Sequence, residues 1–102
     1  MSVIDFKQEV IEWAKEVRVV PKEIHVRKMN RKWASCSKKG RLTFSLALLK
    51  EPKDVKARAI VHELLHMKYP NHGKMFNSLL IAHLRNKGIK FKREGSHKGQ
   101  VL

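Results

Sequence analysis

Two histidines four positions apart, His62 and His66, enclose a glutamate, Glu63, in the pattern His-Glu-Leu-Leu-His. On a helix, side chains at positions i and i+4 lie on the same face, so both imidazoles can bind one divalent cation. Glu63 is turned by about 100° from His62, which places its carboxylate beside the cation and not on it. The spacing therefore predicts a zinc (Zn²⁺) site in which Glu63 is the general base that takes a proton from a metal-bound water.

A third histidine, His72, follows six residues after His66. Pro70 and Asn71 interrupt the helix just before it, so the chain can turn back and bring the His72 imidazole to the same ion. From the composition of the chain, about 0.001 accidental matches to the full pattern are expected, which favours a metal site over a chance motif on a core helix. Three protein ligands would leave the fourth position of the zinc for water, as is typical of catalytic zinc sites.

The segments before this motif have the patterns of one helix and three strands. Apolar residues recur at helical spacing over residues 3–18, which predicts an amphipathic helix with Ser2 as its N-cap and an end before Pro21. Three short segments have the residue pattern of strands, at residues 23–29, 33–37 and 42–46. We expect these strands to form a three-stranded antiparallel sheet that the first helix covers.

The motif itself lies on the longest predicted helix, which begins after Pro52 and runs to about Tyr69. This helix is apolar on nearly all sides, which indicates that it is buried. Two imidazoles and a carboxylate are costly to bury without partners, and a bound cation facing a cleft would remove most of that cost. A last helix is predicted over residues 72–87, with Asn71 as its cap and Gly88 at its end.

Length and composition indicate one small and strongly basic domain. The 102 residues fit a single domain over residues 1–102, of which 89–102 form a basic C-terminal tail. The formal net charge of +14 makes nucleic-acid binding possible, but the basic residues are spread along the chain, so it is not expected. No apolar stretch could cross a bilayer and no secretory signal is evident, so we expect a cytoplasmic protein without membrane association.

The motif and its surroundings resemble a known group of small metallopeptidases. The likeness rests on His62–His66 with Asn71–Gly73 and Phe76, and on Trp33–Cys36. The first stretch resembles the minigluzincins, and the second, continued to Phe76, is similar to the YgjP-like metallopeptidase domains. The resemblance implies an α+β, zincin-like minimal domain with an N-terminal backing helix, a small sheet, an active-site helix and a C-terminal helix. It also implies that the third zinc ligand is His72 and not the glutamate typical of gluzincins.

The resemblance further implies how a substrate would bind. Zincins hold a peptide as an added antiparallel strand along a sheet edge above the metal, which is β-augmentation. We expect residues 41–46 to be this edge, because they precede the active-site helix. A second electrophile usually holds the oxyanion of the tetrahedral intermediate, and the candidate donors are Tyr69, His83 and His97.

These features favour a zinc metalloendopeptidase that acts on proteins or peptides. Two alternatives stay open, a zinc hydrolase of nucleotide phosphoanhydrides and a nucleic-acid-associated protease, because the positive charge would suit either. The tail carries His97 and ends in a carboxylate at Leu102, and either group could occupy the open zinc position. The resemblance to the minigluzincins also points to such latency, as in a zymogen.

The remaining potential ligands have structural interpretations. His83 shares a face with apolar residues of the last helix, which favours a core histidine over a ligand. His25 lies on the polar face of a strand and is expected at the surface. Cys36 is the single cysteine, so it cannot form an internal disulfide, and we expect a buried structural thiol.

Overall fold

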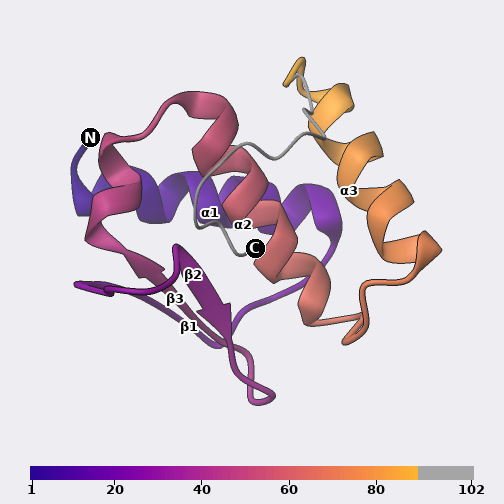
Figure 1. Cartoon of the computed structure of the whole chain (residues 1–102), viewed down its shortest axis with the longest axis horizontal. Helices are drawn as coiled ribbons and strands as arrows, with labels where there is room; N and C mark the ends of the chain where they lie inside the picture. The colour runs from indigo at the N-terminus through magenta and orange to yellow at the C-terminus, as the bar shows by residue number, and fades with distance from the viewer. Residues whose placement is uncertain (90–102) are drawn as a thin grey trace.

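In the described part of the chain, a computed structural model shows three α-helices packed with a three-stranded sheet (Figure 1). The structure describes residues 1–89. Along the chain the elements are α1 (Val3–Val17), β1 (Glu23–Arg27), β2 (Ala34–Cys36), β3 (Arg41–Ser45), the 3₁₀ turn η1 (Leu46–Lys50), α2 (Lys53–His66) and α3 (Lys74–Asn86). Helices α1 and α2 lie on the same side of the sheet, with α2 against strand β2 and α3 against α2. The predicted α+β class is confirmed.

Helix α1 is the backing helix that the apolar spacing predicts. The backbone N–H of Asp5 donates to the Ser2 hydroxyl oxygen at 3.0 Å and so satisfies one of the free N–H groups at the helix start. The helix ends where Arg18 adopts the left-handed conformation, with a φ of 69°. The buried face consists of Phe6, Val10, Trp13, Ala14 and Val17. The ring of Phe6 packs edge-on against Phe44 of β3, with 5.2 Å between centroids, which fixes α1 to the sheet.

The sheet is mixed, with the strand order β1-β3-β2, and this corrects the antiparallel sheet expected from the sequence. Strands β2 and β3 form an antiparallel hairpin, but β1 pairs in parallel with the opposite side of β3. The side chains of Leu42 and Phe44 on β3 are fully buried. Because β3 lies in the centre of the sheet, its backbone N–H and C=O groups find hydrogen-bond partners on both sides. The alternation of apolar and polar residues indicates which face a strand buries but not which strand lies beside it.

The strand order also overturns the expected substrate edge. Residues 41–46 were predicted to offer a free edge, but β3 is hydrogen-bonded to β1 on one side and to β2 on the other. Within residues 1–89, the two edges of the sheet that pair with no further strand belong to β1 and β2. Since β2 is the strand in contact with α2, its edge is the one next to the histidine motif.

Helix α2 runs through the core, and every residue from Ala59 to Leu65 is buried, as its apolar surroundings predict. It ends at His66, earlier than predicted. There the hydrogen bonds shorten to a three-residue spacing, and the backbone N–H of Met67 donates to the carbonyl oxygen of Leu64 at 3.1 Å. Helix α3 begins at Lys74 with Gly73 as its N-cap. The prediction that Asn71 caps this helix is therefore wrong, and the loop between the two helices is longer than expected.

The predicted absence of a membrane span and the predicted basic tail can be compared with the described residues. Within residues 1–89, no helix is both long enough and apolar enough to cross a membrane. Ile89, the first residue of the predicted basic tail, is buried. Residues 90–102, the rest of that tail, lie outside the described residues.

Candidate metal centre

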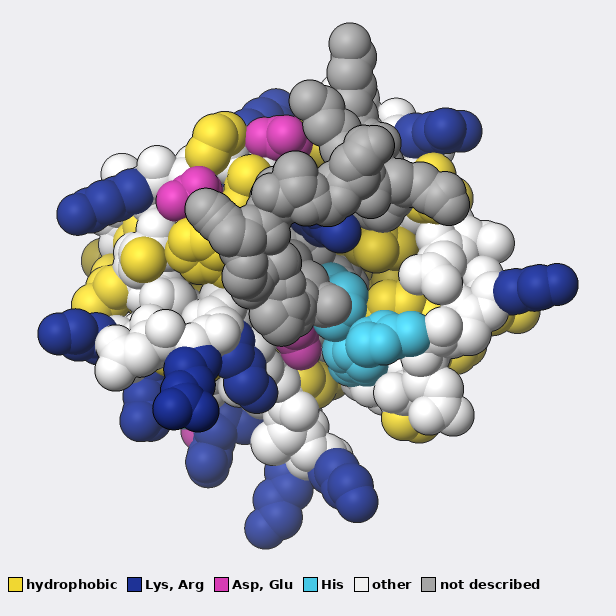
Figure 2. All heavy atoms as spheres, viewed as in Figure 1, with side chains coloured by type: hydrophobic (Ala, Val, Ile, Leu, Met, Phe, Trp, Pro, Cys, Tyr) yellow, Lys and Arg dark blue, Asp and Glu magenta, His cyan; other side chains and the backbone are white. Residues whose placement is uncertain are grey.

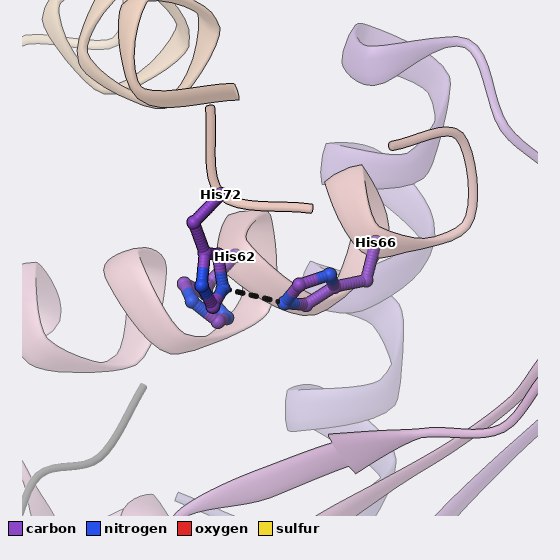
Figure 3. Close-up of side chains that lie close together, drawn as sticks. All are labelled: His62, His66 and His72. Atoms are coloured by element: carbon purple, nitrogen blue, oxygen red, sulfur yellow. Dashed lines mark hydrogen bonds between the residues drawn. The ribbon is translucent and has the colours of Figure 1, made fainter. Parts of the chain in front are cut away.

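Three imidazoles meet at the C-terminal end of α2 (Figure 3). His62 and His66 lie one turn apart on the same face of α2, and His72 comes from the loop that leads to α3. Each ring offers one nitrogen, and these three atoms all lie within 4.8 Å of one another. The structure thus brings together the three residues that the sequence predicts as metal ligands.

The separations between the nitrogens suit a tetrahedral ion. Two nitrogens bound to one tetrahedral zinc at about 2.0–2.1 Å lie about 3.4 Å apart. The Nε2 atoms of His66 and His72 are 2.9 Å apart, and no two of the three nitrogens are more than 4.8 Å apart, so all three are close to the separation that one ion requires. Among residues 1–89, no carboxylate or thiol joins this group. An all-imidazole set fits zinc and similar transition metals, whereas magnesium and calcium prefer oxygen ligands.

Hydrogen bonds at the other ring nitrogens orient the ligands. Nδ1 of His66 lies 3.3 Å from the backbone carbonyl oxygen of Tyr69. Because a carbonyl only accepts, Nδ1 carries the proton and Nε2 keeps its lone pair for a metal. Nδ1 of His62 lies 3.1 Å from a carboxylate oxygen of Glu63, and a proton at that nitrogen likewise leaves Nε2 free.

The surroundings of His66 favour its neutral form. Burial lowers the pKa of His66 below 6.5, positive charge on His62 and His72 acts in the same direction, and the Glu63 carboxylate opposes both. A metal binds the neutral imidazole, so the lowered pKa keeps this residue ready for ligation at neutral pH. Glu63 itself is only 5% exposed and lies at the inner end of the site.

Phe76 of α3 supports all three imidazoles. Its ring centroid lies 5.1 Å from that of His62, 4.8 Å from that of His66 and 4.8 Å from that of His72. The side chain is 1% exposed, so its own position is fixed by the core. Contact with a fixed aromatic surface restricts the rotation of the three rings. Helical spacing marks Phe76 only as a core residue, and its contact with the ligands depends on how α3 packs on α2.

The histidines open onto a cleft of about 410 Å³ between α2 and the β2–β3 hairpin. Glu63 lines it on one side, and residues 34–38, which include strand β2, line it on the other. Two basic side chains, Lys32 and Lys38, also line the cleft. Figure 2 shows the histidines at the surface with an acidic side chain beside them, and Lys and Arg side chains gathered on the sheet side of the molecule. The sequence did not single out these two lysines, because basic residues occur throughout the chain.

The other candidate donors stand apart from the cleft. The Tyr69 side chain packs against the core, and Tyr69 meets the site through its backbone carbonyl. His83 points from α3 towards α1, with Nδ1 3.5 Å from a Glu16 carboxylate oxygen, and is only partly buried. Neither residue lines the cleft, so both are badly placed to hold a substrate oxyanion. His97 lies outside the described residues.

Cys36 is not placed as the sequence predicts, whereas His25 is. Cys36 is only half-buried and lines the cleft, whereas we expected a buried structural thiol. Burial raises the pKa of Cys36, and the nearby negative charge of Glu63 raises it further, so the thiol stays protonated at neutral pH. His25 is exposed on β1, with Nε2 2.7 Å from a Glu23 carboxylate oxygen, which confirms it as a surface residue.

Comparison with known proteins adds the following. The chain matches the family model of the YgjP-like metallopeptidase domain over residues 3–87. No curated protein matches the sequence. Among solved structures, the fold is similar to the crystal structure of the metallopeptidase zymogen abylysin of Pyrococcus abyssi, with a TM-score of 0.63 and 23% sequence identity over 80% of this chain and 86% of that chain. At this identity the structural likeness shows a shared fold.

Proposed function

The chain belongs to the YgjP-like family of metallopeptidase domains, and from this premise we propose that it is a zinc-dependent endopeptidase. The observation that carries the proposal is the convergence of three imidazole nitrogens within 4.8 Å of one another, with the Glu63 carboxylate adjacent and buried. His62, His66 and His72 are the proposed ligands. When bound there, zinc would supply Lewis-acid chemistry, lowering the pKa of water towards about 7 and polarising a carbonyl group.

Glu63 is the proposed general base. Its carboxylate takes a proton from the attacking water and later delivers that proton to the leaving amine, so the carboxylate is restored at the end of each cycle. Its position supports this role, because Glu63 lines the cleft but is not among the three clustered ligands. The low exposure of the carboxylate limits competition from bulk water.

The free edge of β2 is the proposed binding surface for the substrate. β-Augmentation requires unpaired backbone groups next to the metal, and β2 is a sheet edge in contact with α2. Residues 34–38 line the same cleft as the histidines, which supports this edge in place of 41–46. A peptide lying along β2 can extend past the metal in both directions, which is why we propose an endopeptidase.

The test is the substitution Glu63→Gln in the zinc-loaded protein. Glutamine keeps the size and can accept a hydrogen bond from His62, so zinc content should stay at the wild-type level while peptide cleavage falls by about 10²–10⁴-fold. Glu12→Gln, an exposed change on α1, is the control and should alter neither quantity. Full cleavage by Glu63→Gln would remove Glu63 from the mechanism. Release of phosphate from nucleotides without peptide cleavage would favour the phosphoanhydride alternative.

We also propose that the tail restrains the activity. The basic tail contains His97, whose side chain is of a type that can bind zinc, and the abylysin structure is described as that of a zymogen. Deleting residues 95–102 should then raise peptide cleavage and the affinity for a zinc-directed hydroxamate inhibitor. His97→Gln in the full chain separates ligation by the imidazole from other effects of the tail. Unchanged cleavage and inhibitor binding in the deletion variant would contradict latency.

A further inference from the structure

The cleft beside the histidines has an uneven charge. Of the residues that the structure describes, Lys32 and Lys38 are its basic lining residues and Glu63, which the proposed mechanism uses as the base, is its one acidic lining residue. A divalent ion on the histidines would make the cleft more positive still. Any negative group on a substrate would therefore meet complementary charge along the walls and, among residues 1–89, no opposing carboxylate other than Glu63.

Both lysines are available to a ligand among the described residues. Each is exposed, and within residues 1–89 neither side chain takes part in a hydrogen bond or an ion pair. By contrast, the exposed Arg41 is held by Glu23 at 3.0 Å. An exposed lysine without a partner can bind an anion without first breaking an existing contact.

The two lysines flank the proposed substrate edge. Strand β2 comprises Ala34–Cys36, so Lys32 lies two positions before the strand and Lys38 two positions after it. Only Ala34–Cys36 is strand, and Lys38 lies in the turn that leads to β3. A peptide that extends past both ends of β2, rising about 3.3 Å per residue, could bring charges about six residues apart near the two lysines. The bond to be cleaved would lie between those charges, near the histidines.

We propose that Lys32 and Lys38 select acidic peptide segments, each lysine binding a carboxylate side chain on one side of the scissile bond. This inference rests on the proposed peptidase function and on the β2 edge as the binding surface. A nucleic acid is the other polyanion that such charges could attract. The cleft favours the peptide, because no Phe, Tyr or Trp side chain among the described residues lines it for base stacking, its three imidazoles are the proposed metal ligands, and its lysines lie near the two ends of a strand instead of along a continuous track.

The binding test uses three labelled peptides that differ only at two positions six residues apart, which carry Glu, Gln or Lys. Their affinity for the zinc-loaded Glu63→Gln variant is measured by fluorescence anisotropy in 50 and 300 mM salt. If each lysine forms one exposed ion pair with the peptide, the Glu peptide should bind about 2–30-fold more tightly than the Gln peptide. Salt should weaken this preference, since the charges are exposed.

Charge reversal at the lysines provides the specific readout. Lys32→Glu/Lys38→Glu should reverse the order, so that the Lys peptide binds most tightly. The matched control is Lys22→Glu/Lys28→Glu, which makes the same charge change at two exposed lysines flanking β1, at the opposite edge of the sheet. This control should keep the preference for the Glu peptide. Equal effects of the two double variants would attribute the preference to net charge and overturn the proposal.

Cleavage of the same peptides by the wild-type protein tests the selectivity for acidic peptides separately from the proposed peptidase function. Cleavage of all three peptides at equal kcat/KM would leave the peptidase function in place and overturn the selectivity. Charge-selective binding without any cleavage would contradict the peptidase function but support the lysines as an acidic-peptide site. Tighter, Lys32- and Lys38-dependent binding of a single-stranded oligonucleotide would assign the lysines to nucleic acid and overturn the proposal.

Discussion

Replacing Phe76 with leucine should weaken metal binding as well as the fold. Phe76 is 1% exposed and its ring lies within 5.1 Å of the three histidine rings, measured between centroids. Leucine leaves a cavity of roughly 25 Å³, which costs about 0.6 kcal/mol, and the lost apolar contacts add about 1 kcal/mol. We therefore expect the free energy of unfolding of the metal-free protein to fall by about 1–2 kcal/mol.

Zinc affinity should fall by a further, separate amount, because the imidazoles lose the surface that restricts their rotation. Changes to groups that support metal ligands typically reduce affinity by about 10–100-fold, equivalent to about 1.4–2.7 kcal/mol. Phe6→Leu is the matched control. Phe6 is as deeply buried and also has an aromatic neighbour, Phe44 at 5.2 Å, but it does not contact the histidines. It should lose similar stability and keep its zinc affinity.

The assay pairs urea unfolding of the metal-free proteins with zinc competition against a chromophoric chelator at pH 7.5. The two measurements separate loss of global stability from loss of ligand orientation. Wild-type zinc affinity in Phe76→Leu would refute the orienting role of the ring. Equal weakening of zinc binding in both phenylalanine variants would trace the effect to the fold alone.

Three further predictions follow from the described contacts. Burial and the negative charge of Glu63 raise the pKa of Cys36. Iodoacetamide should therefore alkylate Cys36 of the metal-free protein at pH 8 more slowly than it alkylates free cysteine. Glu63→Gln should restore part of the alkylation rate. The pKa of His66 is lower in the folded protein than its ordinary 6.5, so the unfolded chain binds a proton at this residue more readily. The metal-free protein should therefore lose stability as the pH falls below 6.5. Urea unfolding should show a lower free energy of unfolding at pH 5.5 than at pH 7.5, and His66→Gln should reduce this difference. Arg18 ends α1 at a φ of 69°, so Arg18→Gly should raise the free energy of unfolding by up to about 1 kcal/mol in thermal or urea melts, and a decrease would contradict the strain argument.

The clustering of His62, His66 and His72 could be predicted from the sequence because its geometry is local. His62 and His66 are held by one helix, and helical periodicity alone puts them on one face. His72 follows the helix end so closely that the chain has few ways to carry its ring elsewhere. The backing helix was predictable for the same reason, since Ser2 and the apolar stripe starting at Phe6 are signals carried by neighbouring residues.

The features that depend on contacts between distant segments were not predictable. The parallel pairing of β1 with β3 results from which strand takes the centre of the sheet, and alternation within each strand does not encode it. The misplaced substrate edge follows from that one error. Likewise, the contact of Phe76 with the ligands requires the packing of α3 on α2, and the position of Lys32 and Lys38 in the cleft requires the hairpin to lie beside α2.

X-ray absorption spectroscopy at the zinc edge of the reconstituted full chain tests the central claim most directly. We expect one zinc per chain with three imidazole nitrogens at about 2.0–2.1 Å and one oxygen ligand. His72→Ala should lose one imidazole from this pattern, while His83→Ala should leave it unchanged. A sulfur ligand at about 2.3 Å, or a spectrum that His72→Ala does not alter, would contradict the three-histidine centre on which the proposed function rests.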